Sequence, residues 1–73
     1  MKGSRLSPRE KECLRWIAQG RDVSETALAT GLSEHTVRTY LRAARMKLDC
    51  VTVSQAIYKA TVSGLLDHMP VSR

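Results

Sequence analysis

Three arginine residues spaced for one face of a helix are the side chains in this chain best suited to bind a charged partner. Arg38, Arg42 and Arg45 follow one another at intervals of four and three residues, so on an α-helix they would lie side by side. A guanidinium group stays positively charged and donates several hydrogen bonds, which suits phosphate groups and the edge of a guanine base. The pattern therefore indicates a helix face that binds a polyanion, with an ordinary solvated face as the alternative.

The segment around these arginines also carries an apolar stripe that would fix the helix to a core. Four apolar residues recur in it at helical spacing: Val37, Leu41, Ala44 and Leu48. Residues 33–48 hold four basic residues and one acidic residue, so they contribute +3 to the chain's net charge of +5. We predict an amphipathic helix here, with its basic face adjoining its buried face.

Start and stop signals along the chain predict four helices, at about residues 8–19, 23–30, 34–48 and 53–63. Three of them would open with a capping box: Ser7 with Glu10, Asp22 with Glu25, and Thr52 with Gln55. Ser33 would cap the third helix, and glycines follow the other three: Gly20, Gly31 and Gly64. No strand pattern competes, so the predicted fold class is all-α, a compact four-helix bundle.

The connection between the second and third helices is about three residues long and contains Gly31. Two helices joined in this way form a helix-turn-helix, in which the second helix enters the major groove of DNA. An ordinary helical hairpin is the alternative, but the basic stripe lies on the second helix of the pair and not on the first. In the first helix of the pair we expect Ala27 and Leu28, together with Val23, to face the core.

The composition of the chain narrows the classes of function that it can have. Seventy-three residues make one small domain, and a pI near 9.8 favours an anionic partner. No apolar run approaches the length of about 18 residues that a membrane span needs. The possible metal ligands Cys13, Cys50, His35 and His68 form no closely spaced pair, which excludes a typical zinc site. Reduced thiols predict a cytoplasmic protein. The sequence contains no recognisable catalytic motif, so we do not expect an enzyme.

These motifs together resemble the C-terminal DNA-binding domain of LuxR-type (GerE- or FixJ-type) bacterial transcription regulators. The resemblance covers residues 6–66 and is carried by these segments: Leu6–Glu10, Ile17–Gly20, Gly31–Glu34, Thr36–Arg38, Lys47–Leu48 and Gln55–Ala56. Trp16 and Asp49 are most similar to the quorum-sensing branch, which responds to acyl-homoserine lactones. Residues 1–5 would then be a disordered edge of the domain or a remnant of cloning, and residues 67–73 a C-terminal tail.

The resemblance implies a third helix that reads double-stranded DNA and a fourth helix that pairs two subunits. It implies no cofactor within this domain, because an acyl-homoserine lactone would bind in an N-terminal sensory domain that this chain lacks. RNA polymerase is a further candidate partner. Four positions depart from the family pattern: Thr26 stands for Ile, Thr30 for Leu, Asp49 for Gly, and Tyr40 for His.

Roles at the expected DNA interface follow from position along the third helix. We predict base contacts from Arg38, Arg42 and Thr39, since arginine pairs with guanine and threonine can touch a thymine methyl group. Six residues are predicted to contact phosphate: His35, Thr36, Tyr40, Arg45, Lys47 and Ser24. The alternatives are helix capping for Thr36 and a solvated charge for Arg45 and Lys47.

The fourth helix has two faces, one suited to the core of the domain and one suited to a second subunit. Its core stripe contains four residues: Val53, Ala56, Ile57 and Ala60. The other side carries small or mildly apolar residues suited to close contact between two helices: Ser54, Tyr58, Thr61 and Val62. We expect a homodimer through this side, weak in the isolated domain. Sequence-specific DNA binding is the predicted function, and use of the helix-turn-helix mainly for protein docking is the alternative.

Overall fold

The computed structural model describes residues 6–64, and four α-helices make up this range. They are α1 (Pro8–Ala18), α2 (Val23–Thr30), α3 (Glu34–Lys47) and α4 (Val53–Val62). No strand occurs between residues 6 and 64, so the predicted all-α fold class is confirmed. Three predicted helices end one residue earlier than expected, where Gln19, Leu48 and Ser63 form C-caps. The predictions for residues 1–5 and 65–73 lie outside the described residues.

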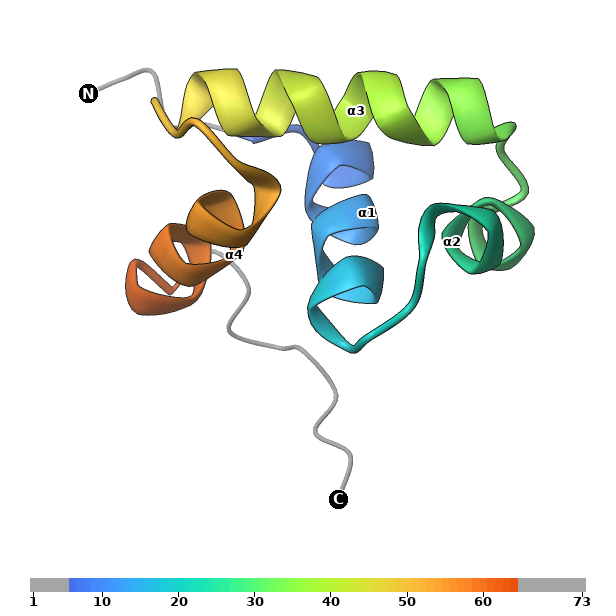
Figure 1. Ribbon diagram of the computed structural model, residues 1–73, viewed down its shortest axis with the longest axis horizontal. Coiled ribbons are helices and arrows are strands. Elements are labelled where there is room, and N and C mark those ends of the chain that lie inside the picture. Colours follow the sequence, from blue (N-terminus) through green and yellow to red (C-terminus); the bar gives the residue numbers. More distant parts are fainter. Residues whose placement is uncertain (1–5, 65–73) are drawn as a thin grey trace.

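The bundle is organised around the crossing of α1 and α3. Each of these two helices packs against all three other helices, whereas α2 and α4 do not contact each other. Figure 1 shows α3 lying along the top of the molecule, with α1 standing beneath its middle and with α2 and α4 at opposite ends. One long side of α3 is therefore left uncovered by the rest of the described chain.

Local side-chain bonds fix where the helices begin. Ser7 Oγ accepts from the backbone N–H of Glu10 at 3.1 Å, and Glu10 Oε1 accepts from the backbone N–H of Ser7 at 2.9 Å. The other two predicted capping boxes form in the same way, and Ser33 caps α3. Because each N-cap contributes about 1 kcal/mol, four caps are a substantial part of the stability of so small a domain.

The end of α3 shows how the chain replaces a glycine. Asp49 adopts a left-handed conformation with φ of +59°. Its N–H donates to the carbonyl of Met46 at 3.0 Å, and the N–H of Cys50 donates to the carbonyl of Arg45 at 2.9 Å. This is a Schellman motif, which α1 builds with Gly20 at φ of +97°. Aspartate tolerates the left-handed region better than most residues, so the departure from the family pattern does not change the turn.

The core confirms the predicted stripe of α3 but corrects the prediction for α2. The stripe residues Val37, Leu41, Ala44 and Leu48 are all buried. Leu28, which was expected to face the core, has 84% of its surface exposed, and Thr26 is fully buried in its place. In a helix of only eight residues, several rotations bury a similar number of apolar side chains. Packing against α1 and α3 decides between them, and it selects the side that holds Thr26 and Ala27.

Burial of Thr26 leaves a polar atom without a partner. The Oγ1 atom of Thr26 is inaccessible to solvent and makes no hydrogen bond. An unsatisfied buried hydroxyl costs about 1–3 kcal/mol relative to the same group in water. The resemblance described above implies an apolar residue here, so this position is expected to be a local weakness of the chain.

We predict that Thr26→Val stabilises the domain by about 1 kcal/mol, because valine keeps the shape of the side chain and removes the unsatisfied hydroxyl. Thermal unfolding should show a rise in Tm of roughly 4–8 °C for a domain of this size. Thr26→Ser is the matched control, since it retains the hydroxyl and loses a methyl group; it should lower Tm. A Tm for Thr26→Val at or below that of the unchanged chain would contradict the prediction.

Candidate nucleic-acid interface

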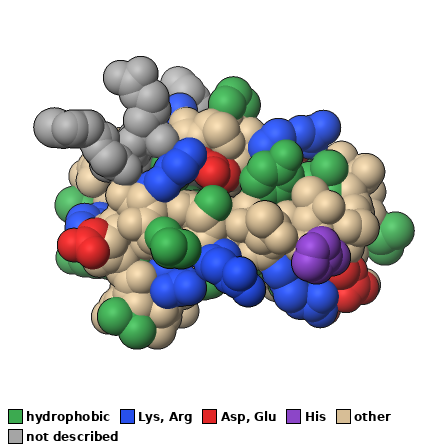
Figure 2. Space-filling model, turned by 90° about the horizontal axis from the view of Figure 1, so that it is seen from above, with side chains coloured by type: hydrophobic (Ala, Val, Ile, Leu, Met, Phe, Trp, Pro, Cys, Tyr) green, Lys and Arg blue, Asp and Glu red, His purple; other side chains and the backbone are tan. Residues whose placement is uncertain are grey.

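The uncovered side of α3 presents a row of exposed side chains, with two arginines and one carboxylate among them. The exposed residues on this side are Glu34, His35, Arg38, Thr39, Arg42 and Met46. Figure 2 views the molecule from above α3 and shows Lys and Arg side chains gathered along this face, with apolar side chains between them. The face opposes the buried stripe of the same helix, so none of its side chains is needed to fill the core.

The three residues predicted to contact bases all lie on this face, and they differ in the hydrogen bonds and ion pairs that they make within the domain. Arg38 Nη2 donates to Glu34 Oε1 at 3.3 Å, which forms an ion pair between successive turns of α3. Arg42 makes no ion pair within residues 6–64. Thr39 Oγ1 donates to the carbonyl of His35 at 3.0 Å, so its hydroxyl hydrogen is occupied. The methyl group of Thr39 remains available for an apolar contact, as predicted for a thymine methyl group.

The first turn of α3 combines a helix cap with the residues predicted to bind phosphate. Ser33 Oγ accepts from the backbone N–H of Thr36 at 3.0 Å and donates to Thr36 Oγ1 at 2.9 Å. The side chain of Thr36 therefore takes part in the cap, which was the alternative role weighed for it. His35 is exposed beside this turn, and Ser24 is exposed in the first turn of α2. Phosphate contacts by these residues stay predictions.

Two of the predicted phosphate-binding cations have partners inside the domain. Arg45 is half-buried, and its Nη1 donates to the carbonyls of Cys50 and Val51 at 3.4 and 3.3 Å. Lys47 Nζ donates to Glu10 Oε1 at 2.8 Å and joins the end of α3 to the start of α1. Both cations hold the C-terminal part of α3 in place. Their contact with phosphate stays a prediction, and each cation would have to divide its N–H groups between these acceptors and the phosphate.

The partner of Lys47 is a buried carboxylate. The side chain of Glu10 is only 7% exposed, whereas that of Lys47 is 41% exposed. Burial raises the pKa of Glu10, but hydrogen bonds from Lys47 and from Ser7 and the charge of Lys47 outweigh it, so the pKa is lowered below its usual value. Sequence reasoning assigned Glu10 only to the capping box, because 37 residues separate it from Lys47.

Tyr40 is half-buried and packs against the core cluster beneath α3. It therefore differs from the fully exposed residues of the basic face. Its predicted role as a phosphate contact rests on the phenol oxygen, since the ring takes part in packing. A phenol can donate a hydrogen bond to phosphate while its ring stays packed.

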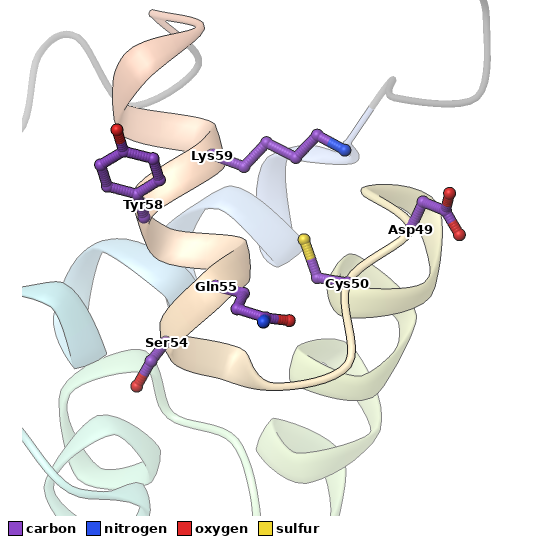
Figure 3. Close-up of a pocket in the computed structure, with 6 residues that line it drawn as sticks. All are labelled: Asp49, Cys50, Ser54, Gln55, Tyr58 and Lys59. Carbon is purple, nitrogen blue, oxygen red and sulfur yellow. The ribbon is translucent and has the colours of Figure 1, made fainter.

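The outer side of α4 also matches its predicted position. The four residues predicted to pair two subunits, Ser54, Tyr58, Thr61 and Val62, are all exposed. Tyr58 is 72% and Val62 68% exposed, so both side chains are free to meet a partner. Figure 3 shows Tyr58 and Ser54 projecting from one side of α4, and Lys59 reaching toward the end of α3. Lys59 Nζ donates to the carbonyl of Leu48 at 2.8 Å, a bond that sequence reasoning did not foresee.

Other kinds of site find little support in the part of the chain that the structure describes. An open pocket of about 630 Å³ lies beside α4 and is lined by Asp49, Cys50, Ser54, Gln55, Tyr58 and Lys59 (Figure 3). No group of three or more potential metal ligands occurs within residues 6–64. In the same range, no helix combines the length and the apolar character required to cross a bilayer.

The ion pair between Lys47 and Glu10 should make stability depend on pH in a defined direction. We predict that Lys47→Met lowers the free energy of unfolding by about 1–2 kcal/mol near neutral pH, less than for a fully buried pair because Lys47 is partly solvated. The pKa of Glu10 is lowered in the folded chain, so the contribution of the pair is present above the usual carboxyl pKa. It is lost as the pH falls through the lowered value.

Urea unfolding near pH 7 and at a series of lower pH values checks this prediction. The difference between Lys47→Met and the unchanged chain should shrink as the pH falls through the lowered pKa of Glu10 and the carboxylate takes up a proton. Lys11→Met is a matched control, because it removes the same charge from a lysine that makes no ion pair within residues 6–64. A difference for Lys47→Met that is the same at all pH values would contradict the assignment.

Comparison with known proteins places this geometry in a family. The family described as bacterial regulatory proteins, luxR family, matches residues 4–60. Over 64 residues, or 88% of this chain, the sequence is 41% identical to the quorum sensing-dependent transcriptional regulator VjbR of Brucella ovis, of which 25% is covered. It is 40% identical over 62 residues to the transcriptional activator LuxR of Aliivibrio fischeri, covering 85% of this chain and 25% of that protein.

A further relative, the quorum sensing-dependent transcriptional regulator RpaR of Rhodopseudomonas palustris, is 40% identical over 63 residues, covering 86% of this chain and 26% of RpaR. The chain therefore spans about a quarter of the length of these relatives. The matched region contains α1, α2 and α3 complete, with most of α4. On this evidence the chain belongs to the luxR family of bacterial regulatory proteins and forms its helix-turn-helix domain.

Proposed function

We propose that this domain binds a specific double-stranded DNA operator through the exposed face of α3, as the DNA-binding part of a transcription regulator. The observation that carries the proposal is the division of α3 into two sides. One side is buried through Val37, Leu41 and Ala44, and the other is exposed and carries Arg38 and Arg42. A helix held this firmly on one side presents its other side at a fixed orientation, as reading base edges requires.

The arrangement of α2 supports docking of α3 into the major groove. α2 packs against both α1 and α3, and it joins α3 through the short turn at residues 31–33. In helix-turn-helix proteins the first helix of the pair crosses the DNA backbone while the second enters the groove. Ser24, exposed at the start of α2, would then lie beside a phosphate of the adjoining strand.

We propose that the longer protein is a regulator of the quorum-sensing type, because the printed names of VjbR and RpaR describe such regulators. Its signal, an acyl-homoserine lactone, would bind in a separate N-terminal domain. The regulator would act in the cytoplasm by binding, without catalysing a reaction. RNA polymerase is proposed as a further partner on the operator.

The base-reading role of the arginines can be tested with an operator selected from a random DNA pool. We predict that Arg42→Ala or Arg38→Ala weakens binding to that operator by about 1–3 kcal/mol and relaxes the base preference at one position. Titrations of the operator and of random duplexes at several salt concentrations measure both effects. Arg21→Ala is the control: it removes an exposed arginine from the connection before α2, and it should leave the operator preference intact.

Two outcomes of these titrations would count against the proposal. Equal losses on operator and random DNA for Arg38→Ala and Arg42→Ala would mean that these side chains contact only phosphate. A chain that shows no salt-dependent DNA binding at low ionic strength would overturn the DNA-binding proposal altogether. The helix-turn-helix would then be better explained as a module for protein docking.

We also propose a two-fold homodimer through the outer side of α4. The exposed residues Tyr58 and Val62 lie one turn apart there, with the small side chains of Ser54 and Thr61 beside them. Small residues let two helices approach closely, and an isologous contact of this kind would place two α3 helices about 10 bp apart on DNA. Four side chains cover little area, so the dimer of the isolated domain should be weak.

Val62→Arg should abolish cooperative binding to DNA that carries two half-sites, because it puts two like charges near the symmetry axis. The matched control uses the same variant on DNA with a single half-site, where affinity should stay the same or rise slightly from the added charge. Gel-shift stoichiometry separates the two bound forms. Unchanged cooperativity on two half-sites would show that α4 does not form the dimer contact.

A further inference from the structure

The face proposed to read DNA contains one acidic residue, Glu34, and this residue is bonded to an arginine proposed to read a base. Glu34 Oε1 accepts from Arg38 Nη2 at 3.3 Å, with side-chain exposures of 48% for Glu34 and 61% for Arg38. We propose that Glu34 is a specificity-determining residue, which positions Arg38 for guanine and penalises DNA that offers its carboxylate no hydrogen-bond donor. The inference rests on the proposed function and deepens it.

The position of the pair in α3 places both side chains at the proposed groove. Glu34 is the first residue of α3, and Arg38 follows one turn later on the same side. Helical side chains lean toward the N-terminus of their helix, and the N-terminal residues of a recognition helix contact base edges. The carboxylate of Glu34 and the guanidinium of Arg38 would therefore enter the major groove together.

The surroundings of Glu34 explain why its charge matters to DNA. It lines a shallow depression between α2 and α3 together with Ser24, Gly31 and Leu32. Ser24 is the residue proposed to meet a backbone phosphate, so the carboxylate would lie close to the path of the phosphates. At such short range salt screens the repulsion only in part. Bound DNA must compensate for this repulsion with a hydrogen bond to the carboxylate. DNA sequences that offer no donor there should therefore bind less tightly.

The hydrogen-bonding chemistry defines which bases can compensate. With one Nη2 hydrogen given to Glu34, Arg38 still has N–H groups for the O6 and N7 atoms of guanine. The ion pair restricts the rotamers of Arg38, so less freedom is lost on binding. The carboxylate itself can accept from the amino group of cytosine or adenine. The pair should therefore select guanine next to a base that bears an amino group in the major groove.

A structural role explains Glu34 less well than a role in recognition. An exposed ion pair between adjacent helical turns contributes little to stability, and so does an acidic residue in the first turn. Ser33, not Glu34, caps the helix. Glu34→Gln should therefore fold normally, and a change in DNA preference would report on recognition.

The test compares Glu34→Gln with Glu12→Gln, a matched control that removes the same charge. Glu12 pairs with Arg9 at 3.0 Å across three residues of α1, and it lies away from the exposed face of α3. Each variant and the unchanged chain are titrated with the selected operator, with random duplexes, and with operators in which the base beside the guanine is replaced by thymine. Thymine offers only an acceptor and a methyl group there.

For Glu34→Gln we expect random DNA to bind about threefold tighter or more at low salt, and operator preference over random DNA to fall by about fivefold or more. The penalty for thymine beside the guanine should shrink, because a glutamine can both donate and accept. Glu12→Gln should change neither the preference nor the thymine penalty. In an Arg38→Ala background, Glu34→Gln should have a smaller effect on the preference, since the positioning role is already lost.

Equal behaviour of Glu34→Gln and Glu12→Gln on all DNA would overturn the role of Glu34. If the unchanged chain still prefers its operator in that experiment, the proposed function stands without this refinement. If the unchanged chain shows no preference among DNA sequences, the proposed function itself fails, and the inference fails with it. The two failures are therefore distinguished by the same set of titrations.

Discussion

The structure depends most on the packing of α3 across α1. Val37 and Ala44 of α3 are completely buried, and Cys13 and Leu14 of α1 are completely buried in the same cluster. Because α3 also contacts α2 and α4, a shift of α3 along α1 would disturb its packing against all three other helices. Alanine at position 44 lets the helices approach closely, in a chain that has no phenylalanine to fill a wider gap. The orientation of the basic face is thus set by apolar contacts on the opposite side.

The positive charges divide between two tasks along α3. Toward its C-terminus, Arg45 and Lys47 bond to acceptors within the domain, and Lys59 of α4 donates to the carbonyl of Leu48. These cations satisfy carbonyl groups at the helix end and a buried carboxylate, which would otherwise be costly to leave unpaired. Toward the N-terminus, Arg38 and Arg42 point outward. The net charge of the chain therefore overstates how many cations are available to DNA.

Sequence reasoning succeeded where the determining interactions are local. The capping boxes at Ser7, Asp22 and Thr52 depend on residues three positions apart, so spacing alone revealed them. The long apolar stripe of α3 likewise left only one rotation of the helix possible. The exposed basic face followed from the same stripe, and with it the placement of the residues proposed to contact bases.

The sequence-based predictions failed where contacts between residues far apart in the chain determine the structure. α2 is too short for its own pattern to fix its rotation, so the burial of Thr26 and the exposure of Leu28 depend on how it packs against other helices. The bond from Lys47 to Glu10 joins residues 37 positions apart. The pair of Glu34 and Arg38 was different, because its spacing of four residues is visible in the sequence. The spacing alone does not show that the two side chains are bonded, since both are exposed and could equally be solvated.

The separation of the two sides of α3 has a consequence for how such domains diverge. Arg38, Thr39 and Arg42 are exposed and fill no part of the core, so exchanging them should cost little stability. Val37, Leu41 and Ala44 have no such freedom, because each is enclosed by neighbouring side chains. Substitution of the exposed residues therefore leaves the packing of the fold unchanged. In a domain with so small a core, the proposed DNA specificity is best carried by exposed residues, because substitution of the buried ones would cost stability.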